Sequence, residues 1–476
     1  MPKKKENLSP EERLKQALIP KEEELYKLPD NWVWTRLIGY FAECLDNFRK
    51  PINATERAKR KGNIPYYGAT GQVGVIDDYL LEGEFILLGE DGAPFLEPLK
   101  NKAYKIKGKA WVNNHAHVLR SFFGEIGNEY MLHYLNIFDY KDYVNGTTRL
   151  KLTQEKMKKI CIPLPPLNEQ KRIVEKLDSL FEKTGKIKEV IEEVKEKTFQ
   201  RREAVLSKAF TGELTEKWRA ENKTENAKEL LLRINEEKLK NNSKAKIKDI
   251  SEMLVNEDEI PYKVPDNWVW TRLGDITNYG EVKQIKAEDI SENDWILELE
   301  DIEKGTFKLL NRVLKKERQN KSNKHVFFKG DILYSKLRPY LNKILIAEED
   351  GYATTEIIPF KGLFNLDNKY IFYYFTFSKT IEMINFLTHG MQMPRLGTDK
   401  AKNLLFPLPP LEEQKEIVRI LDKIFEEEEK ISELISIENQ VEILEKTILD
   451  KAFRGELGTG NIDDEPALEL LKKVIK

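Results

Sequence analysis

A proline-rich segment that opens onto a long helical pattern occurs twice in this 476-residue chain. The first copy, Cys161–Lys183, reads CIPLPPLNEQKRIVEKLDSLFEK, and the second, Leu405–Glu427, reads LFPLPPLEEQKEIVRILDKIFEE. Proline fixes φ and pushes the preceding residue out of the helical region, so an extended segment leads into each helix. Glu169 and Glu413 fall in the first helical turn, where a carboxylate complements the helix dipole. We therefore expect two domains built on two copies of one helix.

Other blocks repeat at a similar spacing of about 240 residues, which indicates that half of the protein was duplicated. The copies lie in the same order in both halves. They are LPDNWVWTRL at Leu28–Leu37 with VPDNWVWTRL at Val264–Leu273, and SKAFTGEL at Ser207–Leu214 with DKAFRGEL at Asp450–Leu457.

The two ends of the chain together match its centre. The tail EPALELLK at Glu465–Lys472 is similar to ENAKELLL at Glu225–Leu232, and the head LIPKEEELYK at Leu18–Lys27 is similar to LVNEDEIPYK at Leu254–Lys263. The connector that follows the first long helix is thus divided in the second copy, with one piece at the C-terminal end of the chain and the other at the N-terminal end. We expect the tail to fold beside the head, and the two halves to be related by a pseudo-twofold axis.

Each long helix carries apolar residues at alternating steps of three and four, from Ile173 to Val205 and from Ile417 to Ile448. Such a stripe buries itself against a partner helix, and a twofold axis makes the two helices antiparallel. About 40 residues at ~1.5 Å each give a rod about 60 Å long. The step of three from Ile431 to Leu434 predicts a local stammer. A surface helix lying on a core is the alternative.

The segments between the helical blocks, 26–162 and 262–406, differ from each other beyond their first residues. Both mix short strand-like runs, such as EFILL at Glu84–Leu88, with one helix-like stretch. The predicted fold is α+β: two globular mixed α/β domains joined by two long antiparallel coiled-coil helices in a pseudo-twofold circular repeat. The expected parts are an N-terminal head (1–25), a first globular domain (26–162), a central helical region with its connector (163–261), a second globular domain (262–406) and a C-terminal helical region (407–476).

Formal charge is distributed unevenly, although the whole chain carries only −2. The first globular segment has 20 basic and 16 acidic residues, the second has 22 and 20, and the remainder carries −8. Basic domains on an acidic scaffold fit a DNA reader, because phosphate contacts need local lysine and arginine. Basic loops at Arg57–Lys61 and Lys315–Lys324 favour that interpretation, with ordinary solvated loops as the alternative.

Motifs for catalysis are missing from the sequence. GxxxxGK[ST] does not occur, and the glycines of Gly68–Gly74 have the spacing of a turn rather than of a dinucleotide fingerprint. Both Pro-Pro pairs are followed by leucine, so the Asn/Asp-Pro-Pro-aromatic loop of adenine methyltransferases is missing too. His115 and His117 lack flanking cysteine or carboxylate residues at metal-ligand spacing, and we interpret them as strand-end polar residues.

Cysteine usage and hydropathy suggest a cytoplasmic protein without membrane contact. The two cysteines, Cys44 and Cys161, are far apart, which fits a reducing compartment. The N-terminal MPKKKENLSPEE lacks the apolar core of a signal peptide. No apolar run approaches the ~18 residues that a membrane span requires.

Together these features resemble the specificity subunit of type I restriction–modification systems. The resemblance rests on the doubled PLPPLxEQ helix start, the paired AFxGEL helix ends, the PDNWVWTRL block before each globular domain and the circular repeat. It covers nearly the whole chain. The globular segments are also similar to known target-recognition domains, through YYGATGQVGVIDDYLLEGEFILLGEDGAP (Tyr66–Pro94), WVNNHAHVL (Trp111–Leu119) and GDILYSKLRPYLNK (Gly330–Lys343).

The resemblance implies a non-catalytic, sequence-specific reader of double-stranded DNA. Each target-recognition domain would contact one half of a split target, and the helices would hold the halves at a fixed spacing. Two DNA methyltransferase (modification) subunits would bind along the helical regions and methylate adenine N6, and two restriction (motor-nuclease) subunits would join for cleavage. This chain would need neither a cofactor nor a metal, since S-adenosylmethionine, ATP and Mg would belong to the partner subunits.

The predicted DNA contacts are side chains that can reach phosphates or base edges. In the first domain they are Arg57, Lys59, Arg60, Lys61, Asn113, Asn114, Thr147, Thr148, Arg149 and Lys151, and in the second Lys321, Lys324, Lys336, Arg338, Gln392 and Arg395. The stretches Gly146–Lys151 and Gly390–Arg395 are included because both lie just before a repeated helix. Lys336 and Arg338 have an alternative interpretation as strand-end charges.

Other functional classes stay open at the level of the sequence. One is a coiled-coil linker between two ligand-binding domains, which would not bind DNA in a low-salt mobility shift with the methyltransferase present. Another is an enzyme whose site lies within the globular domains. A closer alternative is the specificity subunit of a methylation-only or type II-like complex.

Overall fold

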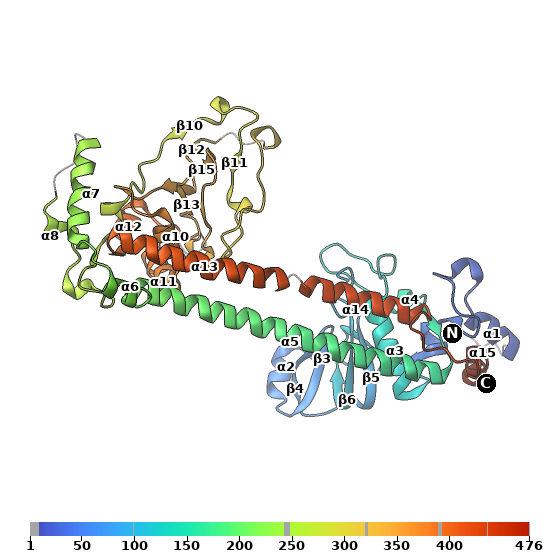
Figure 1. Ribbon diagram of the computed structural model, residues 1–476. Coiled ribbons are helices and arrows are strands. Elements are labelled where there is room, and N and C mark those ends of the chain that lie inside the picture. Colours follow the sequence, from blue (N-terminus) through green and yellow to red (C-terminus); the bar gives the residue numbers. More distant parts are fainter. Residues whose placement is uncertain are drawn as a thin grey trace. The chain divides into compact units, whose positions relative to one another are not determined.

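The computed structural model describes residues 9–98, 100–241, 248–318, 322–388, 393–435 and 437–475 (Figure 1). The chain divides into two compact units, here called unit 1 (Met1–Glu192 with Ile435–Lys476) and unit 2 (Glu193–Leu434). The helix α5 (Leu167–Thr211) contributes residues to both. Unit 1 also contains α14 (Ile437–Phe453), and unit 2 contains nearly all of α13 (Leu411–Ile435). Among the described residues, no helix has the length and apolar character needed to cross a membrane.

The globular domain of unit 1 is built on a six-stranded sheet in the order β2-β7-β5-β6-β3-β4. Neighbouring strands are antiparallel, except that β3 and β6 run parallel. Alternate residues of β5 enter different cores: Ile86 packs with the helix α3 (Gly124–Ile137), whereas Leu87 packs in a cluster on the opposite face. The strands are β2 (Ala42–Cys44), β3 (Ile64–Gly68), β4 (Gly71–Ile76), β5 (Leu81–Gly89), β6 (Ala103–Val112) and β7 (Ala116–Ser121).

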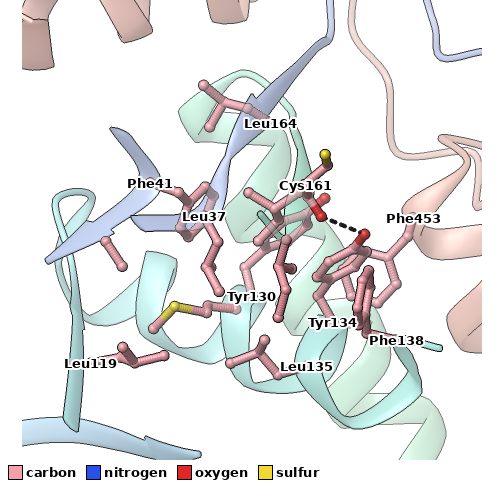
Figure 2. Close-up of a cluster of buried hydrophobic side chains, with 14 of the residues drawn as sticks. Leu37, Phe41, Leu119, Tyr130, Tyr134, Leu135, Phe138, Cys161, Leu164 and Phe453 are labelled. Carbon is pink, nitrogen blue, oxygen red and sulfur yellow. Dashed lines mark hydrogen bonds between the residues drawn. The ribbon is translucent and has the colours of Figure 1, made fainter. Parts of the chain in front are cut away.

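Aromatic side chains join this domain to the helical region within unit 1. The Tyr134 hydroxyl on α3 donates to the carbonyl of Cys161 at 2.8 Å, and both residues lie in the buried cluster of Figure 2. The Phe453 ring on α14 lies 5.0 Å from the Tyr130 ring and 5.1 Å from the Tyr134 ring, centroid to centroid. Edge-on aromatic pairs of this kind add about 0.5–1.5 kcal/mol to the burial itself.

Unit 2 carries a differently built domain. A four-stranded sheet has the order β10-β12-β15-β11, and a separate three-stranded sheet has the order β14-β13-β16. The strands are β10 (Gln284–Ile285), β11 (Ile296–Leu297), β12 (Lys324–Phe327), β13 (Ile332–Ser335), β14 (Ile344–Ile346), β15 (Gly351–Thr354) and β16 (Ile357–Phe360). The helices are α9 (Leu273–Ile276), α10 (Asn368–Thr376), α11 (Ser378–Leu387) and α12 (Thr398–Lys402).

In each unit, two repeated blocks pair as strands at the point where the chain enters and leaves the globular domain. In unit 1, β1 (Val33–Arg36) pairs antiparallel with β8 (Cys161–Leu164), and Trp34 lies opposite Pro163. In unit 2, β9 (Val269–Arg272) pairs antiparallel with β17 (Leu405–Leu408), and Trp270 lies opposite Pro407. The PDNWVWTR block and the proline-rich block are therefore the two strands of one ladder, and each globular domain is inserted between them.

The chain ends meet within unit 1, as the circular repeat predicts. The helix α1 (Pro10–Ala17) packs on α15 (Ala467–Ile475), and Arg13 Nη1 donates to the carbonyl of Ile475 at 3.3 Å (Figure 1). The Thr35 hydroxyl donates to the Ala17 carbonyl at 2.9 Å, and in unit 2 the Thr271 hydroxyl donates equivalently to the Met253 carbonyl at 2.8 Å. The central connector of unit 2 consists of α6 (Glu216–Glu221), α7 (Ala227–Asn241) and α8 (Ile250–Met253).

Helix pairing is antiparallel within each unit, also as predicted. In unit 1, Lys188 of α5 pairs with Glu445, whereas Lys176, earlier on α5, donates to the carbonyl of the later residue Leu457. In unit 2, Arg201 lies 3.8 Å from Glu427, and the later residue Thr215 donates to the earlier Glu413 at 2.7 Å.

The predicted continuous apolar stripe is only partly buried. Ile173 and Leu177 are fully buried, whereas Ile187 is exposed, so the expectation of one buried seam is wrong in the middle of α5. The C-terminal partner comprises α13 and α14, which flank residue 436, outside the described residues. The predicted stammer at Ile431–Leu434 falls on side chains outside the described residues.

Repeated polar contacts explain why the sequence blocks recur together. The Trp32 indole donates to Glu169 at 2.9 Å, and the Trp268 indole donates to Glu413 at the same distance. Both carboxylates are buried, so their role goes beyond the expected dipole effect: they tie the start of a repeated helix to the WVWTR block. The Thr459 hydroxyl also donates to Glu169, at 3.2 Å.

The AFxGEL blocks end helices with a left-handed glycine. Gly212 has φ +81° and Gly455 has φ +73°, a backbone region that side chains other than glycine adopt at a cost. A Cβ on Gly212 would lie 2.4 Å from Pro265, and one on Gly455 would lie 2.3 Å from Pro29. Each glycine thus lets the proline of a PDNW block pack on a helix end.

Short elements complete the described chain. The helices α2 (Ala54–Lys59) and α4 (Gln154–Met157) belong to the domain of unit 1. Residues Leu37–Phe41 form an irregular turn that contains Gly39 at φ +95°. The 3-10 turns are Lys21–Glu23, Asp46–Phe48, Glu257–Glu259, Ala287–Asp289, Leu299–Asp301, Lys315–Glu317 and Pro339–Leu341.

Candidate nucleic-acid interface

Three loops of unit 1 meet around two acidic residues that follow β5. Lys151 pairs with Glu90 at 3.1 Å, and Arg149 pairs with Asp91 at 2.7 Å. His115, in the turn between β6 and β7, places Nδ1 2.7 Å from Asp91 Oδ1. Backbone bonds fix the arrangement, since Asp91 bridges Lys151 and the Glu90 N–H donates to the His115 carbonyl at 2.7 Å. The structure therefore brings the predicted 147–151 stretch and the 113–114 turn together.

A buried ionic network lies beneath these loops. His117 Nδ1 lies 2.7 Å from Asp46 and its Nε2 lies 2.9 Å from the Leu152 carbonyl, so each ring nitrogen faces an acceptor. Arg49 bridges Asp46 at 2.9 Å and Glu90 at 2.6 Å. Burial acts to raise the pKa of Asp46, but hydrogen bonds and positive charge from His117 and Arg49 outweigh it and hold that pKa below its ordinary value of 3.8. This network fixes the position of the loops above it.

Tertiary folding brings Cys44 and Asp46 to His117, with ligand-type atoms within 4.8 Å of one another. The sequence did not show this group, because Cys44 and His117 lie far apart in the chain. The contacts are those of a hydrogen-bond network, since Arg49 occupies one side of Asp46. Burial raises the pKa of Cys44 to about 11, so the thiol stays protonated at neutral pH.

The remaining predicted residues of these loops differ in exposure. Asn114, Thr147 and Thr148 are exposed, as contacts with DNA require. Asn113 is buried, and its side-chain carbonyl accepts the His115 N–H at 2.8 Å. Asn113 therefore shapes the turn in this structure and does not present a free group to a ligand, which departs from the expectation of a contact.

The basic stretch Arg57–Lys61, predicted as a loop, lies on the helix α2 and its C-terminal end. Asn53 caps this helix through the Glu56 N–H at 2.9 Å. Arg57 lies over the Tyr66 ring at 4.8 Å, and Arg60 lies over the Trp111 ring at 4.7 Å and pairs with Asp77 at 2.7 Å. Lys59 and Lys61 are exposed. The arginines thus attach the helix to the sheet, and the lysines are the groups available to a phosphate.

Three of the predicted basic residues of the second domain lie near Glu356. Arg395 pairs with Glu356 through two nitrogens, each at 3.2 Å. The Lys336 N–H donates to the Glu356 carbonyl at 2.9 Å, and the Arg338 N–H donates to the Pro394 carbonyl at 2.8 Å. Arg338 has φ +48°, a left-handed conformation that turns the chain directly after β13. Lys336, Arg338 and Arg395 therefore form one cluster.

Lys324 differs from the prediction of an accessible contact. Its side chain is 0% exposed, and its Nζ lies 2.8 Å from Ser322 and 3.3 Å from Glu298. A phosphate has no access to it here, so Lys324 leaves the set of proposed contacts. Lys321 and Gln392 lie outside the described residues.

Sequence reasoning did not identify the carboxylates that hold the basic residues. Glu90 and Asp91 were quoted only within the stretch Tyr66–Pro94, and Glu356 was not singled out. The turn GEDG was the available signal in the first domain. Glu356 follows β15 without any such signal, because its pairing with Arg395 depends on chain segments that are distant in sequence.

Comparison with known proteins gives a family match. The family described as "Type I restriction modification DNA specificity domain" matches residues 29–196 and 265–439. The type I restriction enzyme EcoDI specificity subunit of Escherichia coli is 26% identical over 432 residues, 90% of this chain and 90% of that protein. A putative type I restriction enzyme specificity subunit of Haemophilus influenzae is 40% identical over 142 residues, 29% of this chain and 35% of that protein.

A solved structure has the same fold. It was described under "Structural basis underlying complex assembly and conformational transition of the type I R-M system", and it aligns with TM-score 0.55 and 18% identity over 91% of this chain and 100% of that chain. The family match covers two equivalent stretches, each running from a PDNW block into a repeated helix. The chain belongs to the type I restriction modification DNA specificity domain family and is a specificity subunit, a DNA-recognition rather than a catalytic component.

Proposed function

We propose that this chain reads a bipartite, asymmetric DNA target, with one half-site for each globular domain. The observation that carries the proposal is that two globular domains of unlike structure are attached to the helices by the same repeated contacts. The two attachment regions share their strand ladders, tryptophan–carboxylate bonds and glycine helix ends. One domain, however, has a six-stranded sheet, and the other has sheets of four and three strands. Different surfaces recognise different base sequences, so the two half-sites differ.

The proposed contacts are basic and polar groups of the two loop clusters. In the first domain they include the exposed Arg149 and Lys151, and in the second the exposed Arg395 with the half-buried Lys336 and Arg338. The ion pair between Arg149 and Asp91 joins side chains that are 62% and 18% exposed. Exposed pairs of this kind contribute only about 0.2–1 kcal/mol, so a phosphate or a guanine edge can replace the carboxylate at small cost.

The helical regions are proposed to set the spacer and to bind the partner subunits. The helix α5 is continuous over 45 residues and contributes to both units, which suits a fixed separation of two reading domains. Large apolar side chains are exposed on these helices, including Val190 and Phe199 on α5 and Ile443 and Leu444 on α14. Exposed apolar residues on a charged helix are typical of a surface that another helix covers.

The partners proposed for these surfaces are two methyltransferase subunits that modify adenine N6, joined by two restriction subunits for cleavage. S-adenosylmethionine, ATP and Mg are assigned to those subunits. Val190, Ile443 and Leu444 are exposed apolar side chains of unit 1, and serine substitutions at these positions remove apolar surface without emptying a core. We expect such variants to fold normally and to lose methyltransferase binding.

The experiment that tests the proposed target is methylome sequencing of a strain that expresses this chain with its cognate methyltransferase. We expect methylated adenines in a motif of two unlike half-sites separated by unspecified bases. A single continuous palindromic motif would show that the two domains do not read separate half-sites. A chain carrying two copies of the first domain is the matched control, and it should direct methylation to a symmetric version of one half-site.

A further inference from the structure

A cavity of about 480 Å³ lies in unit 1, where the globular domain meets the helices. Its apolar wall comes from Leu132 on α3, Phe181 on α5 and Leu449 on α14, and His133 also lines it. Glu445 and other charged groups form the rim, and Lys188 pairs with Glu445 at 2.7 Å. An apolar centre inside a polar rim is the usual anatomy of a protein-binding pocket.

The internal repeat identifies the matching position in unit 2. In unit 1 the Tyr130 and Tyr134 hydroxyls donate to the carbonyls of Pro163 and Cys161, and in unit 2 the Tyr370 and Tyr374 hydroxyls donate to those of Pro407 and Leu405. Phe453 packs on the first pair of tyrosines as Phe210 packs on the second.

This alignment pairs the walls of the two positions residue by residue. Leu132 corresponds to Phe372, and Glu445 corresponds to Arg202. Phe181 corresponds to Phe425: the rings of His133 and Phe181 are 5.6 Å apart, and those of the equivalent pair, Tyr373 and Phe425, are 5.3 Å apart.

In unit 2 the position is filled by a phenyl ring from the domain's own chain. The Phe307 ring lies 5.6 Å from the Phe372 ring, centroid to centroid. Arg202 is stacked between two rings, with its guanidinium 5.0 Å from the centroid of Phe307 and 4.4 Å from that of Phe425. Phe307 therefore occupies the place that is hollow in unit 1.

The segment that carries Phe307 is held in place for this contact. An antiparallel β-bridge between Ile302 and Leu309 joins the two sides of this segment, and Lys308 pairs with Glu429 of α13 at 3.1 Å. Phe307 has φ +63°, a left-handed conformation that is unfavourable for a phenylalanine. Packing of the ring must offset that strain, which indicates that this position in the repeat favours an aromatic side chain.

Unit 1 has no equivalent insertion among its described residues. His133 and Phe181 supply the only aromatic rings of the cavity lining described there. The space suffices, because a cavity of roughly 150 Å³ already holds benzene. His133 Nε2 is buried and has no hydrogen-bond partner among the described residues, with Asp178 Oδ1 3.8 Å away. Burial lowers the pKa of His133 in spite of that carboxylate, which favours the neutral ring, and a neutral ring can bond a phenol or an indole.

We infer that this cavity, lined by Leu132, His133, Phe181 and Leu449, receives an aromatic side chain of the methyltransferase subunit. The inference rests on the proposed function for the identity of the partner, and on the Phe307 contact for the chemistry of the inserted group. A buried aromatic anchor at the centre of an interface carries a large share of its binding energy. Filling the cavity should therefore weaken assembly strongly.

The first experiment tests the cavity in the full-length chain alone. The probe is N-acetyl-4-fluorophenylalaninamide, followed by fluorine NMR at millimolar concentration. We expect saturable binding at one site, loss of that binding in Leu132→Trp, and a second site in Phe307→Ala, where the filled position is opened. Absence of saturable binding, or unchanged binding in Leu132→Trp, would overturn the assigned chemistry.

The second experiment measures affinity for the methyltransferase subunit. We expect Leu132→Trp and Leu449→Trp to weaken binding by roughly 10- to 100-fold, and Glu125→Trp, at an exposed position of α3, to leave it unchanged. Thermal unfolding checks that each variant is folded, and Leu449→Trp serves if Leu132→Trp is not. Equal affinity of the filled variants and the wild type would overturn the inference and leave the proposed function standing. Absence of binding by the wild type would contradict the proposed function, and the probe experiment would still decide what the cavity accepts.

Discussion

The buried carboxylates at the starts of the repeated helices offer a stability test in which each unit is the control for the other. Glu413 is fully buried and contacts four donors: the Trp268 indole, the Asn267 amide, the Thr215 hydroxyl and the Arg219 guanidinium. Glu169 makes the equivalent bond to the Trp32 indole, but its neighbouring arginine, Arg172, pairs with Asp464 instead. The perturbation is Glu→Gln at each position.

The expected magnitudes differ because only one substitution removes the partner of an arginine. Breaking a buried ion pair costs about 3–5 kcal/mol. Because the Arg219 side chain is 20% exposed and water takes part of its charge, we expect Glu413→Gln to cost about 2–3 kcal/mol. Glu169→Gln keeps an acceptor for the indole and loses only the charge on the hydrogen bonds, so about 1 kcal/mol is expected.

The assay is hydrogen–deuterium exchange of the full chain as a function of urea, read separately from peptides of each unit. Glu413→Gln should lower the unfolding free energy of unit 2, and Glu169→Gln should lower that of unit 1 by less. A cost for Glu169→Gln equal to or greater than that for Glu413→Gln would refute the reasoning, because the arginine contact would then be irrelevant. Unchanged exchange in the other unit checks that each effect is local.

Three further predictions use other parts of the chain. Arg149→Ala should weaken binding of target DNA roughly 5- to 100-fold in a mobility-shift assay. If Arg149 reads a base, the sequence specificity should relax; if it contacts a phosphate, the slope of log affinity against log salt concentration should fall by about one. Unchanged affinity would exclude Arg149 as a contact. Because the folded-state pKa of Asp46 is lowered, its stabilising contribution is present above its unfolded value near 3.8 and is lost as pH falls through the lower folded value. Asp46→Asn should destabilise unit 1 at pH 7 and remove that part of its acid sensitivity; an unaltered stability profile across this range would contradict the network. Gly212→Ala should lower the free energy of unfolding by roughly 1–3 kcal/mol, because the alanine would have a positive φ and its Cβ would clash with Pro265. Gly185→Ala has open space around its Cβ position and should stabilise the helix slightly. Thermal unfolding of both variants measures the difference.

The helical scaffold could be predicted from the sequence because its sequence blocks occur twice in the chain. The repeated blocks indicated that the ends of the chain meet and that the helices pair antiparallel, and the contact of Arg13 with Ile475 confirms the first expectation. The turn predicted for Gly68–Gly74 is confirmed in part: residues 69–70 join β3 to β4, whereas Gly71 and Gly74 belong to β4. Local signals of this kind depend only on residues close in sequence or on the comparison of two copies.

The interior of the globular domains could not be predicted in the same way. The network of Asp46, Glu90 and His117 assembles from three distant segments, and no local pattern marks it. The burial of Lys324 depends on Glu298, which lies on a different segment. The two variable domains also differ from each other, so neither serves as a guide to the other.

One error did have a local signal. Arg57–Lys61 was predicted as a loop because of its charge, but Asn53 followed three residues later by Glu56 is a recognisable helix start. That cap predicts a helix that carries Arg57, with Arg60 directly after its last residue, Lys59.

The central claim is that two unlike reading domains are held apart by helices of fixed length. The most direct test removes seven residues from the middle of α5 and seven from α13, followed by methylome sequencing. At ~1.5 Å per residue the helices shorten by about 10 Å, which corresponds to about three base pairs. The account predicts that the spacer shortens while both half-sites stay the same. A change in the specified bases with a constant spacer would contradict it.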